Sequence, residues 1–212
     1  HLLKLILNKK YNPLFSSDAR YFIITGGRGS GKSFAVTVFL TLLTMTKGIR
    51  ILFTRFTMTS AHLSIIPEFL EKIGLLGFDE VFSINKAEVV NTSNQSDILF
   101  RGIRTSAGNQ TASLKSLQGI STWVLDEAEE LVDENIFDTI DLSIREKNIH
   151  NRVVLILNPV TKEHWIYKRF FEDKGVEGGF NGFKDNVCYI HTSYLDNIVN
   201  LSQSFLERIK SI

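Results

Sequence analysis

An eight-residue glycine-rich segment between two apolar runs is the feature that most limits the folds open to this chain. Gly26 to Ser33 reads GGRGSGKS, which fits the pattern G-x-x-x-x-G-K-[ST]. The apolar run Tyr21–Thr25 before it predicts a buried strand, and Lys32–Thr46 after it predicts a buried helix closed by Lys47-Gly48. A strand, a glycine-rich loop and a helix in this order predict the phosphate-binding loop of an α/β domain.

Each residue type in this loop has a chemical use. Glycines allow backbone conformations that point successive N–H groups at phosphate oxygens, and the start of the helix adds unpaired N–H groups. The Lys32 ammonium would reach the β and γ phosphates, and the Ser33 hydroxyl would ligate Mg²⁺. Arg28 either supplies charge beside the γ-phosphate or forms a salt bridge or faces solvent. The residues expected to bind nucleotide are Gly26, Gly27, Arg28, Gly29, Ser30, Gly31, Lys32 and Ser33.

Two carboxylates follow a second apolar run, at the place where a phosphate-binding loop needs a metal-orienting acid. Thr122–Leu125 predicts a strand, and Asp126 and Glu127 come directly after it. Asp126 would hold Mg²⁺ through water, and Glu127 would polarise the attacking water as general base. We interpret Glu129 and Glu130 differently, as the acidic first turn of a helix. The adjacent pair of acids predicts hydrolysis rather than transfer to a bound acceptor.

A third buried strand is predicted over Arg152–Leu157, and it is closed by Asn158-Pro159. The carboxyl ends of such strands face the nucleotide in open α/β sheets. The Asn158 amide would therefore sense the γ-phosphate or position water, and a turn-forming Asn before a proline is the alternative.

The rest of the chain alternates between predicted strands and helices, which indicates a mostly parallel sheet with helices on both faces. Val81–Arg101 has short alternating runs and predicts a β-hairpin or meander inserted beside the main sheet. Gly102–Gly119 is polar and predicts a loop with a short helix near Leu114. The other predicted strands are Arg50–Arg55 and Cys188–Thr192, and the other predicted helices are Ser60–Leu75, Leu131–Ile144, Glu163–Phe171 and Leu201–Ile212.

The charge balance excludes a uniformly basic nucleic-acid binder, because 24 Lys and Arg residues face 23 Asp and Glu residues. Any surface for a polyanion must be local, and Arg101, Arg104 and Lys115 are candidates that would otherwise be solvated surface charge. A single cysteine, Cys188, excludes an internal disulfide and predicts a reducing compartment. No apolar run approaches the roughly 20 residues of a membrane span, so no membrane association is expected.

Four ordered segments together are similar to the large terminase subunit of tailed bacteriophages, above all to the PBSX type. The similarity runs from about Tyr21 to Tyr194. The segments are GGRGSGKS, ILFTRFTMTSAHLSIIPEFLEKIGL, DILFRGIRTSAGNQTASLKSLQGISTWVLDEAEEL, and VVLILNP followed by HWIYKRFF.

The resemblance implies an ASCE-type P-loop ATPase fold and a motor that hydrolyses ATP with Mg²⁺ to drive double-stranded DNA into a procapsid. By resemblance, Lys32 and Ser33 belong to the Walker A motif and Arg28 is its arginine. Asp126 is then the Walker B aspartate, Glu127 the catalytic glutamate, and Asn158 part of the coupling motif. Implied partners are duplex DNA, the portal protein, the small terminase subunit and further copies of the chain in a ring on the procapsid; in isolation a monomer is expected, and the location is the host cytoplasm.

Three departures from the family pattern qualify this reading. We expect residues 1–212 to form one ATPase domain, with 195–212 leading toward a linker and no RNase-H-like nuclease domain or nuclease activity. The family's adenine-contacting motif lies upstream of the phosphate loop, where this chain has Tyr11–Phe15 and no glutamine. A trans-acting arginine is not singled out among Arg55, Arg101 and Arg104.

Other phosphate-loop proteins are the alternatives. A helicase-like DNA translocase shares the expected site. A small-molecule kinase is disfavoured by the adjacent Asp126 and Glu127 and by the lack of an arginine-rich lid. A GTP-dependent switch is disfavoured because the nearest guanine-reading sequence, Asn85-Lys86-Ala87-Glu88, ends in Glu and precedes the Asp126 strand.

Overall fold

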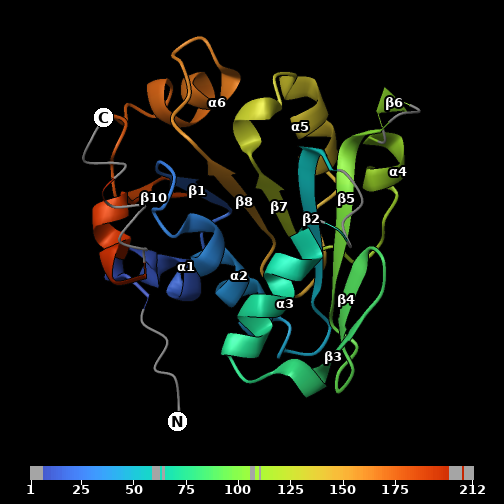
Figure 1. The fold of residues 1–212 in the computed structure, drawn as a ribbon. Helices are drawn as coiled ribbons and strands as arrows, with labels where there is room; N and C mark the ends of the chain where they lie inside the picture. Colours follow the sequence, from blue (N-terminus) through green and yellow to red (C-terminus); the bar gives the residue numbers. More distant parts are fainter. Residues whose placement is uncertain are drawn as a thin grey trace.

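A ten-stranded sheet runs through the computed structural model, which describes residues 7–58, 63, 65–105, 108–109, 111–200 and 207 (Figure 1). Six strands form its parallel centre. In spatial order they are β5 (Asp97–Thr105), β2 (Arg50–Thr57), β7 (Thr122–Asp126), β8 (Arg152–Leu157), β1 (Tyr21–Thr25) and β10 (Val187–His191).

Antiparallel strands extend both edges of this centre. On one edge, β4 (Glu88–Asn91) pairs with β5, and β3 (Phe82–Ile84) pairs with β4. The short β6 (Gly108–Asn109) pairs with the end of β5. On the other edge, β9 (Gly182–Lys184) pairs with β10.

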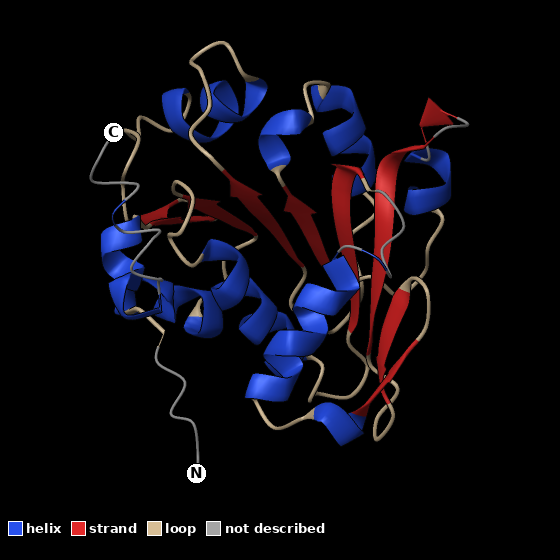
Figure 2. Ribbon diagram, in the orientation of Figure 1, coloured by secondary structure: helices blue, strands red, loops and turns tan. Residues whose placement is uncertain are grey.

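Helices cover both faces of the sheet (Figure 2). One face carries α1 (Asn12–Ser16), α2 (Lys32–Leu43) and α3 (Ile65–Leu75), and the other carries α4 (Thr111–Lys115), α5 (Glu134–Asp141) and α6 (Trp165–Tyr167). A π-helical turn, η5 (Lys168–Glu172), continues α6. Short 3₁₀ turns are η1 (Lys9–Tyr11), η3 (Asp79–Val81), η4 (Ala128–Glu130) and η6 (Tyr194–Asn200).

The central strands are buried on both sides, which explains their continuous apolar sequences. In β1, Phe22 and Ile24 pack in the layer of α2, whereas Ile23 packs in the layer of α5 and α6. In β7, Val124 joins the first layer and Trp123 the second. Successive side chains of a strand point to opposite faces, so each strand supplies both cores.

The predicted α/β fold with a mostly parallel sheet is confirmed. The strands at Tyr21–Thr25 and Arg152–Leu157 begin and end at the predicted residues. The predicted hairpin is also present, but it belongs to the same sheet because β4 pairs with β5. No helix formed by the described residues is both long enough and apolar enough to cross a bilayer.

Several boundaries differ from the prediction. Gly102 and the next three residues are strand rather than loop, because β5 continues along β2, with Gly102 opposite Arg55 and Arg104 opposite Thr57. The helix predicted from Leu131 begins at Glu134, because the Asp133 side chain accepts a hydrogen bond from the Asn135 N–H and caps it.

The other helices keep their positions with shorter extents. The helix predicted to reach Thr46 ends at Leu43, where the N–H of Thr46 bonds to the Leu43 carbonyl in a tighter turn. The helix predicted from Ser60 is described from Ile65 onward. The helix predicted over Leu201–Ile212 falls outside the described residues apart from residue 207.

Candidate nucleotide-binding site

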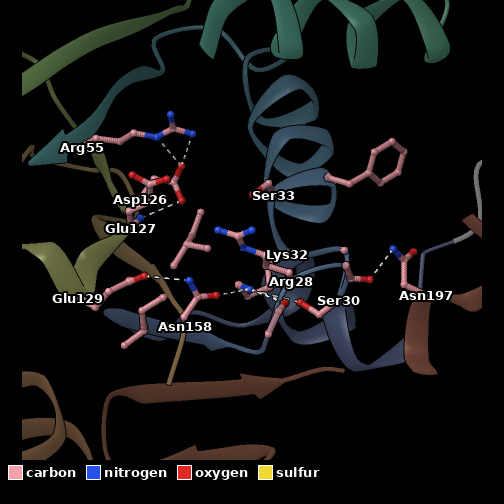
Figure 3. Close-up of a pocket in the computed structure, with 16 residues that line it drawn as sticks. Arg28, Ser30, Lys32, Ser33, Arg55, Asp126, Glu127, Glu129, Asn158 and Asn197 are labelled. Carbon is pink, nitrogen blue, oxygen red and sulfur yellow. Dashed lines mark hydrogen bonds and ion pairs between the residues drawn. The ribbon is translucent and has the colours of Figure 1, made fainter. Parts of the chain in front are cut away.

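A pocket of about 420 Å³ opens where the parallel strands end (Figure 3). The glycine-rich loop forms one side of it, and residues that follow β7 and β8 form the other. Every residue that sequence analysis placed in the nucleotide site lines this pocket, apart from Gly26. The structure therefore brings together residues that lie up to 131 positions apart, from Gly27 through Asp126 and Glu127 to Asn158.

The backbone of the loop requires glycine at two positions. Gly26 has φ of 152°, and a Cβ there would collide with the backbone oxygen of Thr192. Gly31 has φ of 83° and directly precedes the first residue of α2. Tyr11 braces the loop from behind, since its hydroxyl donates to the Ser30 carbonyl at 3.1 Å and contacts the Thr192 hydroxyl at 2.8 Å.

The buried position of Tyr11 bears on the upstream segment Tyr11–Phe15. The Tyr11 hydroxyl donates its hydrogen bond to the loop backbone, and Tyr11 is not among the residues that line the pocket. This segment therefore supports the phosphate loop in the structure, and Tyr11 is not placed to contact a base in the pocket.

The Lys32 ammonium folds back onto its own loop. It donates to the carbonyl oxygens of Gly26 at 2.5 Å and Gly27 at 3.0 Å, and it lies 3.4 Å from Oδ1 of Asn158. Burial lowers the pKa of Lys32, and the carboxylates of Glu129 and then Asp126 oppose that shift. Phosphate oxygens are stronger partners for an ammonium than neutral carbonyls, so a polyphosphate in the pocket would compete for it.

Asp126 is paired with an arginine from the neighbouring strand. The β2–β7 register places Arg55 opposite Asp126, and Nε and Nη2 of Arg55 both lie 2.9 Å from Oδ2. The other oxygen, Oδ1, accepts from the Glu127 N–H at 3.0 Å. Arg55, considered above for a role in trans, is thus held inside the site of its own chain. Of the other two candidates, Arg101 donates to the carbonyls of Ala87 and Phe100, and the Arg104 side chain is exposed.

Glu127 stands at the end of β7 in a left-handed conformation, with φ of 51°. Partial desolvation raises the pKa of its carboxyl above the usual value; Arg55 opposes this shift and Asp126 adds to it. A carboxylate made more basic at the edge of the pocket is better suited to accept a proton from water.

Glu129 has a second position that sequence analysis did not predict. The expected acidic first turn is present, but it belongs to the 3₁₀ helix η4, since α5 begins five residues later, at Glu134. From this turn Glu129 also lines the pocket, where its Oε1 accepts from Nδ2 of Asn158 at 3.0 Å. The cluster DEAEE could have drawn attention to it, because a turn rather than a helix after Asp126 brings alternate acids back toward the strand ends.

Four further residues that line the pocket were not predicted there: Phe34, Ile156, Leu157 and Asn197. Asn197 of η6 donates from Nδ2 to the Gly29 carbonyl at 3.0 Å and packs against Gly31. Phe34 follows the loop and lines the pocket beside it. The sequence carries no signal for Asn197, because its place depends on how the segment after β10 folds back over the loop.

The residues present fit a magnesium ion that arrives with a nucleotide. The Ser33 hydroxyl and the Asp126 carboxylate line the same pocket, and both are oxygen donors. Within the described ranges, no group of three or more His, Cys, Asp and Glu side chains could hold a metal. Mg²⁺ in nucleotide sites takes one or two protein ligands and completes its shell with phosphate oxygens and water, which agrees with this donor set.

Arg28 lies exposed on the loop and lines the pocket. It makes no hydrogen bond or ion pair with another described residue, so the salt-bridge alternative has no support here. Figure 3 shows Arg28 among the residues that line the pocket.

Comparisons with known proteins agree on the family. The profile of the family described as "Phage terminase large subunit" matches residues 18–212. The terminase large subunit of Bacillus phage SPP1 is 23% identical over 229 residues, which span 99% of this chain and 51% of that protein.

Solved structures show a common fold at low identity. A large terminase from a thermophilic bacteriophage superposes with a TM-score of 0.73 at 14% identity, over 97% of this chain and 50% of that one. The N-terminal domain of the DNA packaging ATPase from bacteriophage phi29 gives 0.66 at 16% identity, over 88% and 97%. The chain spans about half the length of the SPP1 protein and of the thermophilic phage protein. Since the family profile covers nearly all of the described fold and the whole of the pocket, this chain belongs to the phage terminase large subunit family.

Proposed function

We propose that this chain is the ATPase motor domain of a terminase large subunit, hydrolysing ATP with Mg²⁺ to move double-stranded DNA into a procapsid. The observation that carries the proposal is the pocket, which joins the phosphate loop to Asp126, Glu127 and Asn158 in a member of this family. The related phi29 domain is described as a DNA packaging ATPase, and its fold matches this one over 88% of the chain.

The geometry supports a division of work among the side chains. The N–H groups of the loop and the Lys32 ammonium would bind the β and γ phosphates. Ser33 and Asp126 would hold Mg²⁺, which when bound neutralises charge on the phosphate oxygens. Glu127 would take the proton from the attacking water.

Two residues remain for the γ-phosphate itself. Arg28 has no partner of its own among the described residues, and its guanidinium would add positive charge as negative charge builds on the leaving phosphates. Asn158 would contact the γ-phosphate or the water, and so report whether the phosphate is present.

The partners of this domain follow from the same proposal. We infer that it acts on duplex DNA with the portal protein and the small terminase subunit, as one member of a ring of copies on the procapsid in the host cytoplasm. A net charge of +1 suits a motor that must grip and release DNA, because the ring rather than one chain would sum the attraction. A single chain would hydrolyse ATP weakly if a neighbouring subunit completes the site.

Nucleotide-dependent melting separates this function from a GTP-dependent switch. ATP and ADP with Mg²⁺ should raise the melting temperature, since a ligand that binds only the folded state stabilises it by mass action. Protection by GTP and not by ATP would support a GTP-dependent switch and overturn the motor. ATP hydrolysis measured with and without procapsids and DNA then tests the ring. A rate that is the same in both conditions would show that no neighbouring subunit is needed to complete the site.

A further inference from the structure

Glu129 is a partly buried acid, and only one of its two carboxylate oxygens has a hydrogen-bond partner among the described residues. Its Oε1 accepts from Asn158, whereas its Oε2 is buried and has no hydrogen-bond partner among the described residues. It lines the nucleotide pocket, and it is the leading charge that opposes desolvation at Lys32. A carboxylate kept in this position costs desolvation energy, which points to a use beyond packing.

The Asn158 amide has two chemically different ends. Its Nδ2 donates to Glu129 at 3.0 Å, and its Oδ1 faces the Lys32 ammonium at 3.4 Å. An ionised carboxylate can only accept hydrogen bonds, so it selects the NH₂ end of the amide. The carbonyl end is then left for Lys32, as Figure 3 shows.

The turn that carries Glu129 is itself held in place. The Leu131 N–H bonds to the Ala128 carbonyl, and the Ala128 side chain is fully buried. Nε2 of His164 lies 2.9 Å from the Glu129 carbonyl oxygen, while Nδ1 of the same ring accepts from the Ile166 N–H. With Nδ1 accepting, Nε2 must be the protonated nitrogen and must donate. The segment after β8 thereby fixes the backbone from which Glu129 reaches Asn158.

We propose that Glu129 is a positioning residue that sets the direction of the Asn158 amide, so that an acceptor and not a donor faces Lys32 and the attacking water. Glu129 need not touch the nucleotide to do this. The proposal rests on the proposed ATPase function and adds a residue and a polarity to it. In the resting pocket, Oδ1 accepts from Lys32; when phosphates draw the ammonium away, the same oxygen is free to accept a hydrogen bond from water.

Variants of the two residues test the polarity. Glu129→Ala should lower kcat about tenfold while KM for ATP changes less than about twofold, because the amide is free to turn its NH₂ group toward the pocket. The kcat of Asn158→Asp should fall at least as far as that of Glu129→Ala, since two carboxylates then face each other. The double variant Glu129→Gln with Asn158→Asp restores a donor facing an acceptor and keeps the net charge of the pair. Its kcat should be about tenfold higher than that of Asn158→Asp alone.

Glu130→Ala is the matched control, because that side chain is exposed, carries the same charge and lies next to Glu129 in the same turn. Melting temperatures of every variant identify any that fail to fold, and only folded variants are compared. Full activity of Glu129→Ala, or a double variant no better than Asn158→Asp, would overturn the proposal. A parent chain that neither binds nor hydrolyses ATP would instead overturn the proposed function, so the two failures are distinguishable.

Discussion

The two ends of the parallel strands differ in how some of their charged side chains are partnered. At the end where the strands begin, Arg20 donates to both a carboxylate oxygen and the backbone oxygen of Asp141, and Tyr21 donates to the other carboxylate oxygen. At the end where the strands finish, Arg28 has no partner among the described residues, and Oε2 of Glu129 is buried without one.

The difference separates groups kept for folding from groups kept for a ligand. Where the strands begin, Arg20, Tyr21 and Asp141 satisfy one another at distances of 2.6 to 2.9 Å, although the buried Nε of Arg152 has no hydrogen-bond partner among the described residues. Where they finish, Lys32 must use loop carbonyls. Changes at the starting end should therefore cost stability, and changes at the pocket end should cost binding and hydrolysis.

The largest expected effect on nucleotide binding comes from Lys32→Ala. This change removes the ammonium that the β and γ phosphates would attract, and nucleotide affinity should fall about a hundredfold or more, beyond ready detection. Calorimetric titration with ATP and Mg²⁺ measures it. The melting temperature without nucleotide should stay close to that of the parent, because Lys32 contacts only its own loop and Asn158. Unchanged affinity would overturn the assignment of the site.

Glu127→Gln separates binding from chemistry at the same end. ATP affinity should be retained while hydrolysis falls about a thousandfold, because an amide cannot accept the proton of the attacking water. Titration of binding and a phosphate-release assay on one preparation check both parts. Ordinary turnover in this variant would remove Glu127 from the role of base.

The sequence predicts some residues of the pocket better than others. Lys32, Ser33, Asp126 and Asn158 were placed at the pocket because a motif or the end of an apolar strand marks each of them. The place of Glu129 in the pocket was not predicted, because the first turn of a helix favours acids for a reason that involves no ligand.

Other parts of the site depend on contacts that no local pattern encodes. Arg55 reaches Asp126 only because β2 and β7 are neighbours in the sheet, 71 residues apart in the chain. Asn197 reaches Gly29 over 168 residues. Tertiary contacts of this kind become visible only once the order of the strands is known.

Asp141→Ala tests the end where the strands begin. It leaves Arg20 and Tyr21 without their shared carboxylate, and breaking a buried ion pair in this way should lower the free energy of unfolding by about 3 kcal/mol. ATP affinity of the folded protein should not change. Chemical denaturation measures the loss, and Asp138→Ala is the control. Arg169 contacts the carboxylates of both Asp138 and Asp141, but that of Asp138 is much more exposed. Its removal should therefore lower the free energy of unfolding by less than about 1 kcal/mol. Equal losses in both variants would contradict the idea that Arg20, Tyr21 and Asp141 form a stabilising network.

The smallest expected effect concerns Asp97, the first residue of β5 and thus also at the starting end. Burial, then a hydrogen bond shared with the Glu88 carboxyl, raises the pKa of Asp97 to about 6, although Arg50 lies 3.4 Å away and opposes the shift. In the unfolded chain an aspartate titrates near about 4. The folded protein therefore binds more protons between these values, and the stability that Asp97 contributes is present below about pH 4 and is lost as the pH rises through about 6.

Asp97→Asn removes this titration and should make the variant more stable relative to the parent at pH 8 than at pH 5. We expect a relative change of about 1 kcal/mol, less than the full shift implies, because the pKa of Glu88 is moved in the opposite direction. Denaturant titrations of parent and variant at both pH values measure it, with Asp173→Asn, an exposed aspartate, as control. A difference independent of pH would show that Asp97 is ionised throughout. Asp97 and Arg50 would then form a full ion pair at both pH values, at the end of the strands opposite the pocket.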